Sequence, residues 1–309
     1  MKNTFISETS SPFVSVIVPV YNDTHRIGKC IESLLQQTYP HDKYEVIIID
    51  NGSTDETREI IKKYPVKLLI EDKIQSSYAA RNKGIKNARG EVIAFTDSDC
   101  IPDSNWIEKG VNNLLQVPNC GLVAGKVNLF FKNPEKPTAV EIYESVNAFP
   151  QKAGIEKYRY GVTANLFTWR SVSENVGLFN DKLKSGGDIE WGGRVFSYGY
   201  KQVFAEDTCV AHPTRYSFSQ LYKRTVRIVG GIDEWKGRNN FFIIGISKDM
   251  VKFIISFLAL LVKVTFNMAP FKKLNESKQK IQYIFVFVFV GIVRILEKIR
   301  LKLGGKTKR

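Results

Sequence analysis

The stretch EVIAFTDSDC occupies residues 91–100 and places two carboxylates directly after an apolar run. Residues 91–96 predict a buried β-strand, because the run is short, rich in apolar residues and followed by polar ones. Asp97 and Asp99 then stand at the carboxyl end of that strand. In open α/β sheets ligands bind outside the carboxyl ends of the strands, so this stretch indicates both a fold class and the place of a site.

Earlier segments repeat this arrangement of an apolar run followed by polar residues. VSVIVPVY at 14–21 leads into Asn22 and Asp23, and YEVIIID at 44–50 leads into Asn51. Segments with helical spacing lie between the runs. The expected order is strands at 14–21, 44–50, 66–70 and 91–96, with helices that begin near residues 27, 53 and 76. This alternation predicts an α/β fold with a mostly parallel sheet and right-handed crossovers.

Local signals predict the ends of two helices. Ser53 and Glu56 stand three residues apart ahead of an apolar pair, which is the capping-box arrangement at a helix start. Gly90 follows the helical segment 76–89 and is the expected C-terminal stop.

The acidic residues allow two interpretations at each position. The D-x-D spacing of Asp97 and Asp99 can direct two carboxylates to one divalent ion together with phosphate oxygens, but the same spacing is common in plain turns. Asp50 and Asn51 either form a strand-to-helix turn or bind a base or ribose.

A second acidic group occurs in KSGGDIEWGGR, residues 184–194. Asp188 and Glu190 are either charges at a helix N-terminus or a carboxylate base presented to an acceptor hydroxyl. His212 follows later in the chain, and a single histidine is more often a structural hydrogen-bonding group than a ligand.

The charge of the chain is unevenly distributed. The formal net charge is +14, yet residues 1–200 contain 24 basic and 24 acidic residues, so the excess lies in 201–309. This excess accompanies apolar runs and no nucleic-acid-binding motif, so we expect no nucleic-acid partner.

The 4 cysteines form no C-x-x-C pair, which argues against a zinc or redox centre. Residues 1–12 lack a signal-peptide pattern and are expected to form a loose leader.

Residues 241–309 predict a helical, membrane-associated tail. Its apolar runs, 251–266 and 281–296, are shorter than the roughly 20 residues that span a bilayer. Basic residues precede, separate and follow the runs: Lys248, Lys252, Lys272, Lys273, Lys278, Lys280 and the segment 298–309. We expect helices that lie in the cytoplasmic face of the membrane beside anionic lipids. Two transmembrane helices, or a helical hairpin buried against the preceding α/β domain, are the alternatives.

Four segments in this order resemble the family-2 glycosyltransferases of the GT-A fold, a Rossmann-like architecture. The segments are VSVIVPVYND (14–23), VIIIDNGSTDET (46–57), ARNKGIKNARGEVIAFTDSD (80–99) and GGDIEW (186–191). The resemblance spans about residues 13–227, and we expect the catalytic domain at 13–240.

The resemblance implies transfer of a sugar from a nucleotide-sugar donor, with UDP as the expected nucleotide. The acceptor would be a saccharide or a lipid-linked glycan in cell-envelope or exopolysaccharide synthesis. Asp188 would be the general base, supported by Glu190, and a single displacement would invert the anomeric centre. A Mn²⁺ or Mg²⁺ ion would bind Asp99 with Asp97 and His212. The residues expected at the nucleotide and its phosphates are Pro19, Tyr21, Asp50, Asn51, Arg81 and Asp97, with Arg224 or Arg227 as further phosphate ligands.

The sequence departs from the family pattern at two points. Gly187 precedes Asp188 where the family commonly has glutamate, and no Gln-x-x-Arg-Trp motif follows, so the resemblance to processive synthases fails. Two other functions stay as alternatives: a membrane-surface binding protein on an inert scaffold of the same fold, and a nucleotidyltransferase. A nucleotidyltransferase would usually have a glycine-rich loop near the first strand, and VPVYND contains no glycine.

Overall fold

The computed structural model describes residues 11–236, 242–266, 268, 271, 274 and 276–308. The chain separates into two compact units. Unit 1 comprises Met1–Asn128, Gln151–Asn180 and Asp188–Ala211, and unit 2 comprises Leu129–Pro150, Asp181–Gly187 and His212–Arg309. Most of the expected leader lies outside the described residues, as do Lys272 and Lys273 of the expected basic tail.

One half of the sheet is parallel and contains the four predicted strands. Their bounds are β1 Val14–Val20, β2 Tyr44–Asp50, β3 Lys67–Ile70 and β4 Val92–Thr96. β1 pairs with β2 and with β4, and β2 pairs with β3, all in parallel register. β1 and β4 are buried along their whole length, as expected of parallel strands covered on both faces. The predicted α/β class is confirmed.

Three helices connect the parallel strands. They are α1 Ile27–Leu35, α2 Thr57–Ile61 and α3 Ser77–Asn87. α1 buries Ile27, Ile31 and Leu34, which are the positions that its helical spacing predicted. The apolar side of this short amphipathic helix therefore stabilises it by packing rather than by intrinsic propensity.

The other half of the sheet contains antiparallel pairs. Its strands are β5 Ile101–Pro102, β6 Cys120–Phe130, β7 Asn165–Trp169 and β8 Lys201–Pro213. The helices between these strands are α4 Trp106–Gln116, the π-helical turn η2 Gly154–Tyr158, α7 Arg170–Val176 and α8 Gly187–Ser197. A short 3-10 helix, η1 His41–Lys43, belongs to the parallel half and directly precedes β2. β7 pairs antiparallel with β4 and β6, and β5 pairs antiparallel with β8. The strand order is β3-β2-β1-β4-β7-β6-β8-β5.

The predicted capping box at Ser53 is wrong. α2 begins at Thr57 with Glu56 as its N-cap, and the Glu56 side chain makes no capping hydrogen bond. The backbone N–H of Thr57 donates instead to Asp55 Oδ1 at 3.1 Å. The Ser53 hydroxyl instead accepts a hydrogen bond from the backbone N–H of Asn22 at 2.9 Å. A partner on another loop therefore replaces the local cap that the sequence pattern suggested.

Gly90 is also not the helix stop that was predicted. α3 ends at Asn87, and Ala88 is its C-cap. A Cβ atom at Gly90 would lie 2.4 Å from the backbone nitrogen of Ser15. Gly90 is therefore required because the chain entering β4 approaches β1 too closely for a side chain.

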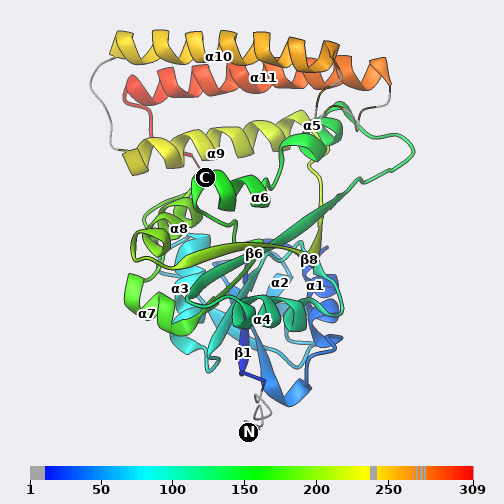
Figure 1. Ribbon diagram of the computed structural model, residues 1–309, viewed down its shortest axis with the longest axis vertical. Coiled ribbons are helices and arrows are strands. Elements are labelled where there is room, and N and C mark those ends of the chain that lie inside the picture. The colour runs from blue at the N-terminus through cyan, green and yellow to red at the C-terminus, as the bar shows by residue number, and fades with distance from the viewer. Residues whose placement is uncertain are drawn as a thin grey trace, which may run out of the picture. The chain divides into compact units, whose positions relative to one another are not determined.

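Unit 2 is mainly helical. Its helices are α5 Ala139–Asn147, α9 Phe218–Lys236, α10 Phe242–Thr265 and α11 Ser277–Lys302. α11 contacts α5, α9 and α10 (Figure 1). It buries Tyr283, Val286 and Val290 in this layer. α9 groups with the later helices, and the expected domain boundary at residue 240 stays a prediction.

α10 carries an exposed apolar stripe, formed by side chains that are each more than half exposed. They are Val251, Ile254, Ile255, Leu258 and Val262. No helix in the described part of the chain combines the length and the apolar content that crossing a bilayer requires.

Candidate functional site

The predicted nucleotide and metal residues of unit 1 lie at the carboxyl edge of three neighbouring strands. Pro19 is near the end of β1 and Tyr21 follows it, while Asp50 ends β2. Asp97 and Asp99 follow β4. Because β2, β1 and β4 are adjacent and parallel, their carboxyl ends meet at one edge of the sheet.

Asp50 is fully buried and holds the turn after β2. Its Oδ1 atom accepts hydrogen bonds from the N–H groups of Gly52 at 3.2 Å and Ser53 at 3.1 Å, and from Arg58 Nε at 2.7 Å. Its Oδ2 atom is buried and has no hydrogen-bond partner among the described residues. A buried carboxylate oxygen without a donor is costly, so Asp50 offers a position where a ligand N–H or O–H can bind.

The neighbours of Asp50 have different surroundings. Asn51 donates its side-chain amide to the carbonyl oxygens of Glu71 at 3.0 Å and Ile74 at 2.8 Å, which fixes the loop after β3. Pro19 is buried within β1, whereas Tyr21 is 41% exposed. Asn51 thus shapes the edge of the site, and Tyr21 presents a ring to solvent beside it.

Arg81 on α3 connects the two acidic motifs. Its Nη2 atom donates to Asp97 Oδ1 at 2.5 Å, and its own side chain is only 4% exposed. Its positive charge also acts on Asp188, whose pKa it lowers against the larger opposite effect of burial. Arg81 Nε is buried without a hydrogen-bond partner among the described residues. Asp97 is therefore neutralised by a cation that the fold holds in place.

Asp99 faces a cation that is less firmly held. Arg26 donates through Nη1 to Asp99 Oδ2 at 3.0 Å and through Nε to Asp23 Oδ1 at 2.6 Å. Asp23 also accepts from Ser98 Oγ at 2.6 Å. The Arg26 side chain is 51% exposed, so it can withdraw at little cost. Asp99 is therefore better suited than Asp97 to exchange its arginine for a metal ion.

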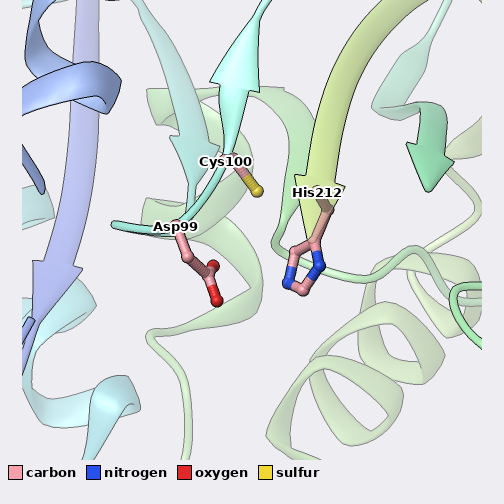
Figure 2. Close-up of side chains that lie close together, drawn as sticks. All are labelled: Asp99, Cys100 and His212. Atoms are coloured by element: carbon pink, nitrogen blue, oxygen red, sulfur yellow. The ribbon is translucent and has the colours of Figure 1, made fainter. Parts of the chain in front are cut away.

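Figure 2 shows Asp99 and Cys100 on the segment that enters β5, and His212 near the end of β8. Cys100 is buried, its thiol donates to the carbonyl of Ala164 at 3.7 Å, and burial raises its pKa well above the usual range. His212 in unit 2 is buried, and its Nδ1 donates to the carbonyl of Pro213 at 2.6 Å. In the neutral ring the lone pair is then on Nε2, the form that binds metals. The carboxylates and this imidazole have the chemistry that a divalent ion such as Mn²⁺ accepts.

Asp188 lies in the first turn of α8. Its Oδ1 atom accepts from the N–H of Ile189 at 3.1 Å and lies 3.4 Å from the hydroxyl of Tyr78. Loss of water around the carboxylate raises its pKa, and Arg81 opposes this effect only in part. A carboxylate with a raised pKa is a stronger proton acceptor than an ordinary aspartate, which suits a general base.

Glu190 forms a bidentate ion pair with Arg194 within α8. Arg194 donates to the two carboxylate oxygens of Glu190 at 2.7 and 3.0 Å, and also to the carbonyl of Leu178 at 2.7 Å and that of Val176. These carbonyls belong to the C-terminal end of α7 and the residues after it. Glu190 therefore helps to fix the start of α8, the helix that carries Asp188.

The arginines predicted as further phosphate ligands belong to α9 in unit 2. Arg224 Nη1 lies 3.8 Å from Glu144 Oε1, and Arg215 donates to Glu144 Oε2 at 2.8 Å. Burial lowers the pKa of Arg224, and Glu144 opposes this effect. The phosphate-binding role of Arg224 and Arg227 stays a prediction.

The sequence analysis missed Arg26, Arg58 and Tyr78, which contact the predicted acids. No spacing rule links Arg26 to Asp99 or Tyr78 to Asp188, because these pairs are far apart in the chain. The signal that the sequence did offer was the position of the two arginines relative to the predicted strands. Arg26 and Arg58 lie early in the segments that follow β1 and β2, and such segments begin at the carboxyl edge of a sheet.

The fold and the site define an α/β enzyme of the GT-A type, with acids gathered at the carboxyl ends of its parallel strands. Residues 15–175 match the family described as Glycosyl transferase family 2. The chain belongs to this family and is a glycosyltransferase. The resemblance inferred from the ordered motifs is therefore confirmed.

Individual relatives agree with this assignment. Glycosyltransferase AglE of Haloferax volcanii is 43% identical over 230 residues, which cover 72% of this chain and 74% of the relative. A transferase of Methanococcus voltae, named dolichyl N-acetyl-alpha-D-glucosaminyl phosphate 3-beta-D-2,3-diacetamido-2,3-dideoxy-beta-D-glucuronosyltransferase, is 25% identical over 228 residues, 69% of this chain and 71% of the relative. The solved structure of mannosyltransferase PcManGT from Pyrobaculum calidifontis, in complex with GDP-Man and Mn²⁺, superposes with a TM-score of 0.61 at 17% identity, over 93% of this chain and 88% of the other. This last likeness concerns the fold alone.

Proposed function

We propose that this glycosyltransferase moves a sugar from a nucleotide diphosphate donor to a saccharide or lipid-linked acceptor, with inversion at the anomeric carbon. The observation that carries the proposal is the arrangement around Arg81. This buried arginine pairs with Asp97 and acts electrostatically on Asp188, so the D-x-D turn and the candidate base flank one cation. Such a grouping of acids with one raised pKa is typical of a catalytic site.

The nucleotide is proposed to bind beside Asp50. The unpartnered Oδ2 atom can accept a hydrogen bond from a base N–H or a ribose hydroxyl. Tyr21, Pro19 and Asn51 form the neighbouring edge, and Arg81 would meet the phosphates. We take a UDP-sugar as the first donor to test, and the GDP-Man named for PcManGT makes a guanosine donor the second.

A divalent ion, Mn²⁺ or Mg²⁺, is proposed to bind Asp99 with help from Asp97 and His212. In the β5–β8 pairing Ile101 lies opposite Ala211; Asp99 comes two residues before Ile101, and His212 directly follows Ala211. The Mn²⁺ named for PcManGT supports a metal in this fold. When bound, the ion stabilises the charge that develops on the leaving diphosphate. Arg26 must release Asp99 for this binding.

Asp188 is proposed to act as the general base. It accepts the proton of the acceptor hydroxyl while that oxygen attacks the anomeric carbon. The bond from this carbon to the diphosphate oxygen breaks, and the nucleoside diphosphate leaves with the bonding electrons. Glu190 is proposed to position Asp188 by holding Arg194 and the start of α8.

The acceptor is proposed to be attached to a lipid at the cytoplasmic membrane face. The exposed apolar stripe on α10 is suited to lie in a lipid interface. The name of the Methanococcus voltae relative describes a dolichyl phosphate-linked acceptor, which supports the same class of acceptor here.

The test is binding and hydrolysis of a panel of nucleotide sugars by the purified chain with Mn²⁺, Mg²⁺ or EDTA. We expect metal-dependent donor binding that is lost in Asp99→Ala. We expect Asp188→Asn to keep donor binding and to lose transfer. If no nucleotide sugar binds under any of these conditions, the proposal is wrong, and an inert scaffold at a membrane becomes the better description. Release of pyrophosphate from a nucleoside triphosphate would instead favour a nucleotidyltransferase.

A further inference from the structure

Unit 2 contains a cavity of about 260 Å³ formed by α5, α10 and α11. Its walls combine basic and apolar side chains: Tyr143, Lys252, Phe253, Ser256, Phe287, Val290, Gly291, Arg294, Ile295 and Lys298. None of the lining residues is acidic. We call this cavity the basic pocket.

The cations of the basic pocket differ from other arginines of unit 2 in their pairing with carboxylates. Arg215 and Arg300 are paired with the carboxylates of Glu144 and Glu297. Lys252 and Arg294, in contrast, have no carboxylate partner among the described residues. Cations that share a cavity repel one another, and this cost is removed when an anion binds between them.

The apolar wall of the basic pocket is preformed. The rings of Phe253 and Phe287 are nearly parallel, with centroids 6.0 Å apart. Gly291 lets Phe253 approach the helix, because a Cβ there would lie 1.9 Å from the ring. This packing holds α10 and α11 together and fixes the shape of the cavity wall.

The mouth of the basic pocket lies next to the exposed apolar stripe of α10. Lys252 and Ser256 are exposed, stand one helical turn apart and directly follow Val251 and Ile255 of the stripe. On α11, Arg294 and Lys298 have the same spacing of four residues and so lie on one helix face. A ligand that fits both features has an anionic head and a long apolar chain.

We infer that the basic pocket binds the phosphate group of a membrane lipid whose hydrocarbon chain lies along the stripe of α10. The inference rests on the proposed membrane-surface location and adds a discrete site to it. The phosphate can belong to a bilayer phospholipid or to an isoprenoid phosphate, because both present the same head to the cations. Arginine and lysine side chains are the usual partners of phosphate groups.

The experiment uses the full chain and three probes: farnesyl phosphate, vesicles of phosphatidylcholine with or without phosphatidylglycerol, and inorganic phosphate. Titration calorimetry measures the first and third, and flotation measures the vesicles. The pocket variant is Lys252→Gln with Arg294→Gln. The matched control is Lys263→Gln with Lys280→Gln, which removes the same charge from the same two helices outside the pocket lining.

We expect a lipid phosphate to bind more tightly than inorganic phosphate. The pocket variant should weaken this binding by about tenfold or more, because two charge-assisted hydrogen bonds are lost, and the control should not. Ser256→Trp, which fills the mouth without changing the charge, should weaken it as well. Loss with farnesyl phosphate assigns an isoprenoid head, and loss with phosphatidylglycerol vesicles assigns a phospholipid head.

Equal losses in the pocket variant and the control would overturn the inference, because they would indicate a diffuse basic surface. Unchanged binding in Ser256→Trp, or inorganic phosphate that binds as tightly as a lipid phosphate, would also overturn it. Melting temperatures check that each variant is folded. Nucleotide-sugar binding is measured on the same preparations, so failure of the proposed transferase function is seen separately from failure of the basic pocket.

Discussion

The sheet edge of unit 1 and the helical layer of unit 2 both hold carboxylates against arginines, but under different conditions. The side chains of Asp97 and Asp99 are 31% and 20% exposed, so solvent reaches both carboxylates. Glu144 in unit 2 is 1% exposed and is shared by two arginines. The acids of the sheet edge can thus exchange or add partners, whereas Glu144 cannot do so without loss of structure. This difference separates charges that serve a ligand from charges that serve the fold.

The largest effect that follows from this comparison concerns Asp188→Asn. The amide cannot accept the acceptor proton, so we expect kcat for transfer to fall by about 10²–10⁴-fold. The Kd for the donor should change little, since the amide has nearly the shape of the carboxylate. Glu144→Gln is the matched change in unit 2, and its kcat per folded molecule should stay close to that of the parent. A similar loss of kcat in both variants would contradict the division of roles.

The second prediction concerns the free energy of unfolding, which Glu144→Gln should lower more than Asp188→Asn does. Glu144→Gln leaves Arg215 and Arg224 without their shared anion, so we expect the free energy of unfolding to fall by about 2–3 kcal/mol. Glu174→Gln, which removes an exposed pair with Arg170, should cost less than about 1 kcal/mol. Urea denaturation followed by circular dichroism measures both. If Glu144→Gln is as stable as Glu174→Gln, the buried pair is not structural.

The pH dependence of transfer is the third test. Burial raises the pKa of Asp188, so the base form is lost at a higher pH than for an ordinary aspartate. Below this pKa we expect kcat/KM to fall by about tenfold for each pH unit, since only the ionised form accepts the proton. The residual transfer rate of Asp188→Asn should not show this fall at low pH. A parent profile that stays flat down to the usual pKa of aspartate would contradict the raised value.

The smallest effect concerns the partner exchange at Asp99. Arg26→Gln removes the half-exposed cation that competes with a metal ion, so we expect Mn²⁺ to bind about two- to fivefold more tightly. Lys29→Gln on α1 is the control for a general loss of positive charge. Electron paramagnetic resonance of free Mn²⁺ measures the affinity. Weaker binding in Arg26→Gln would contradict this competition, because it would mean that the arginine supports the metal site.

The sequence predicted the parallel half of the fold because its signals are local. The apolar runs of β1, β2 and β4 and the spacing of α1 could be found without knowledge of distant contacts, and they correctly placed Asp50, Asp97 and Asp99 at strand ends. The capping box at Ser53 failed for the opposite reason. Its hydroxyl is used by Asn22 on another loop, and no local pattern reports such a competitor.

By itself, therefore, the sequence determined the fold class, the family and the edge of the sheet where the acids gather, because apolar periodicity and motif order are properties of short segments. Only the tertiary structure decided which charges meet. The pairs Arg81–Asp97 and Arg26–Asp99, the partly buried position of Asp188 near Tyr78, and the cations around the basic pocket arise from elements that come together on folding. Electrostatic energies fall off with distance in space and not along the chain, so such partners cannot be inferred from spacing.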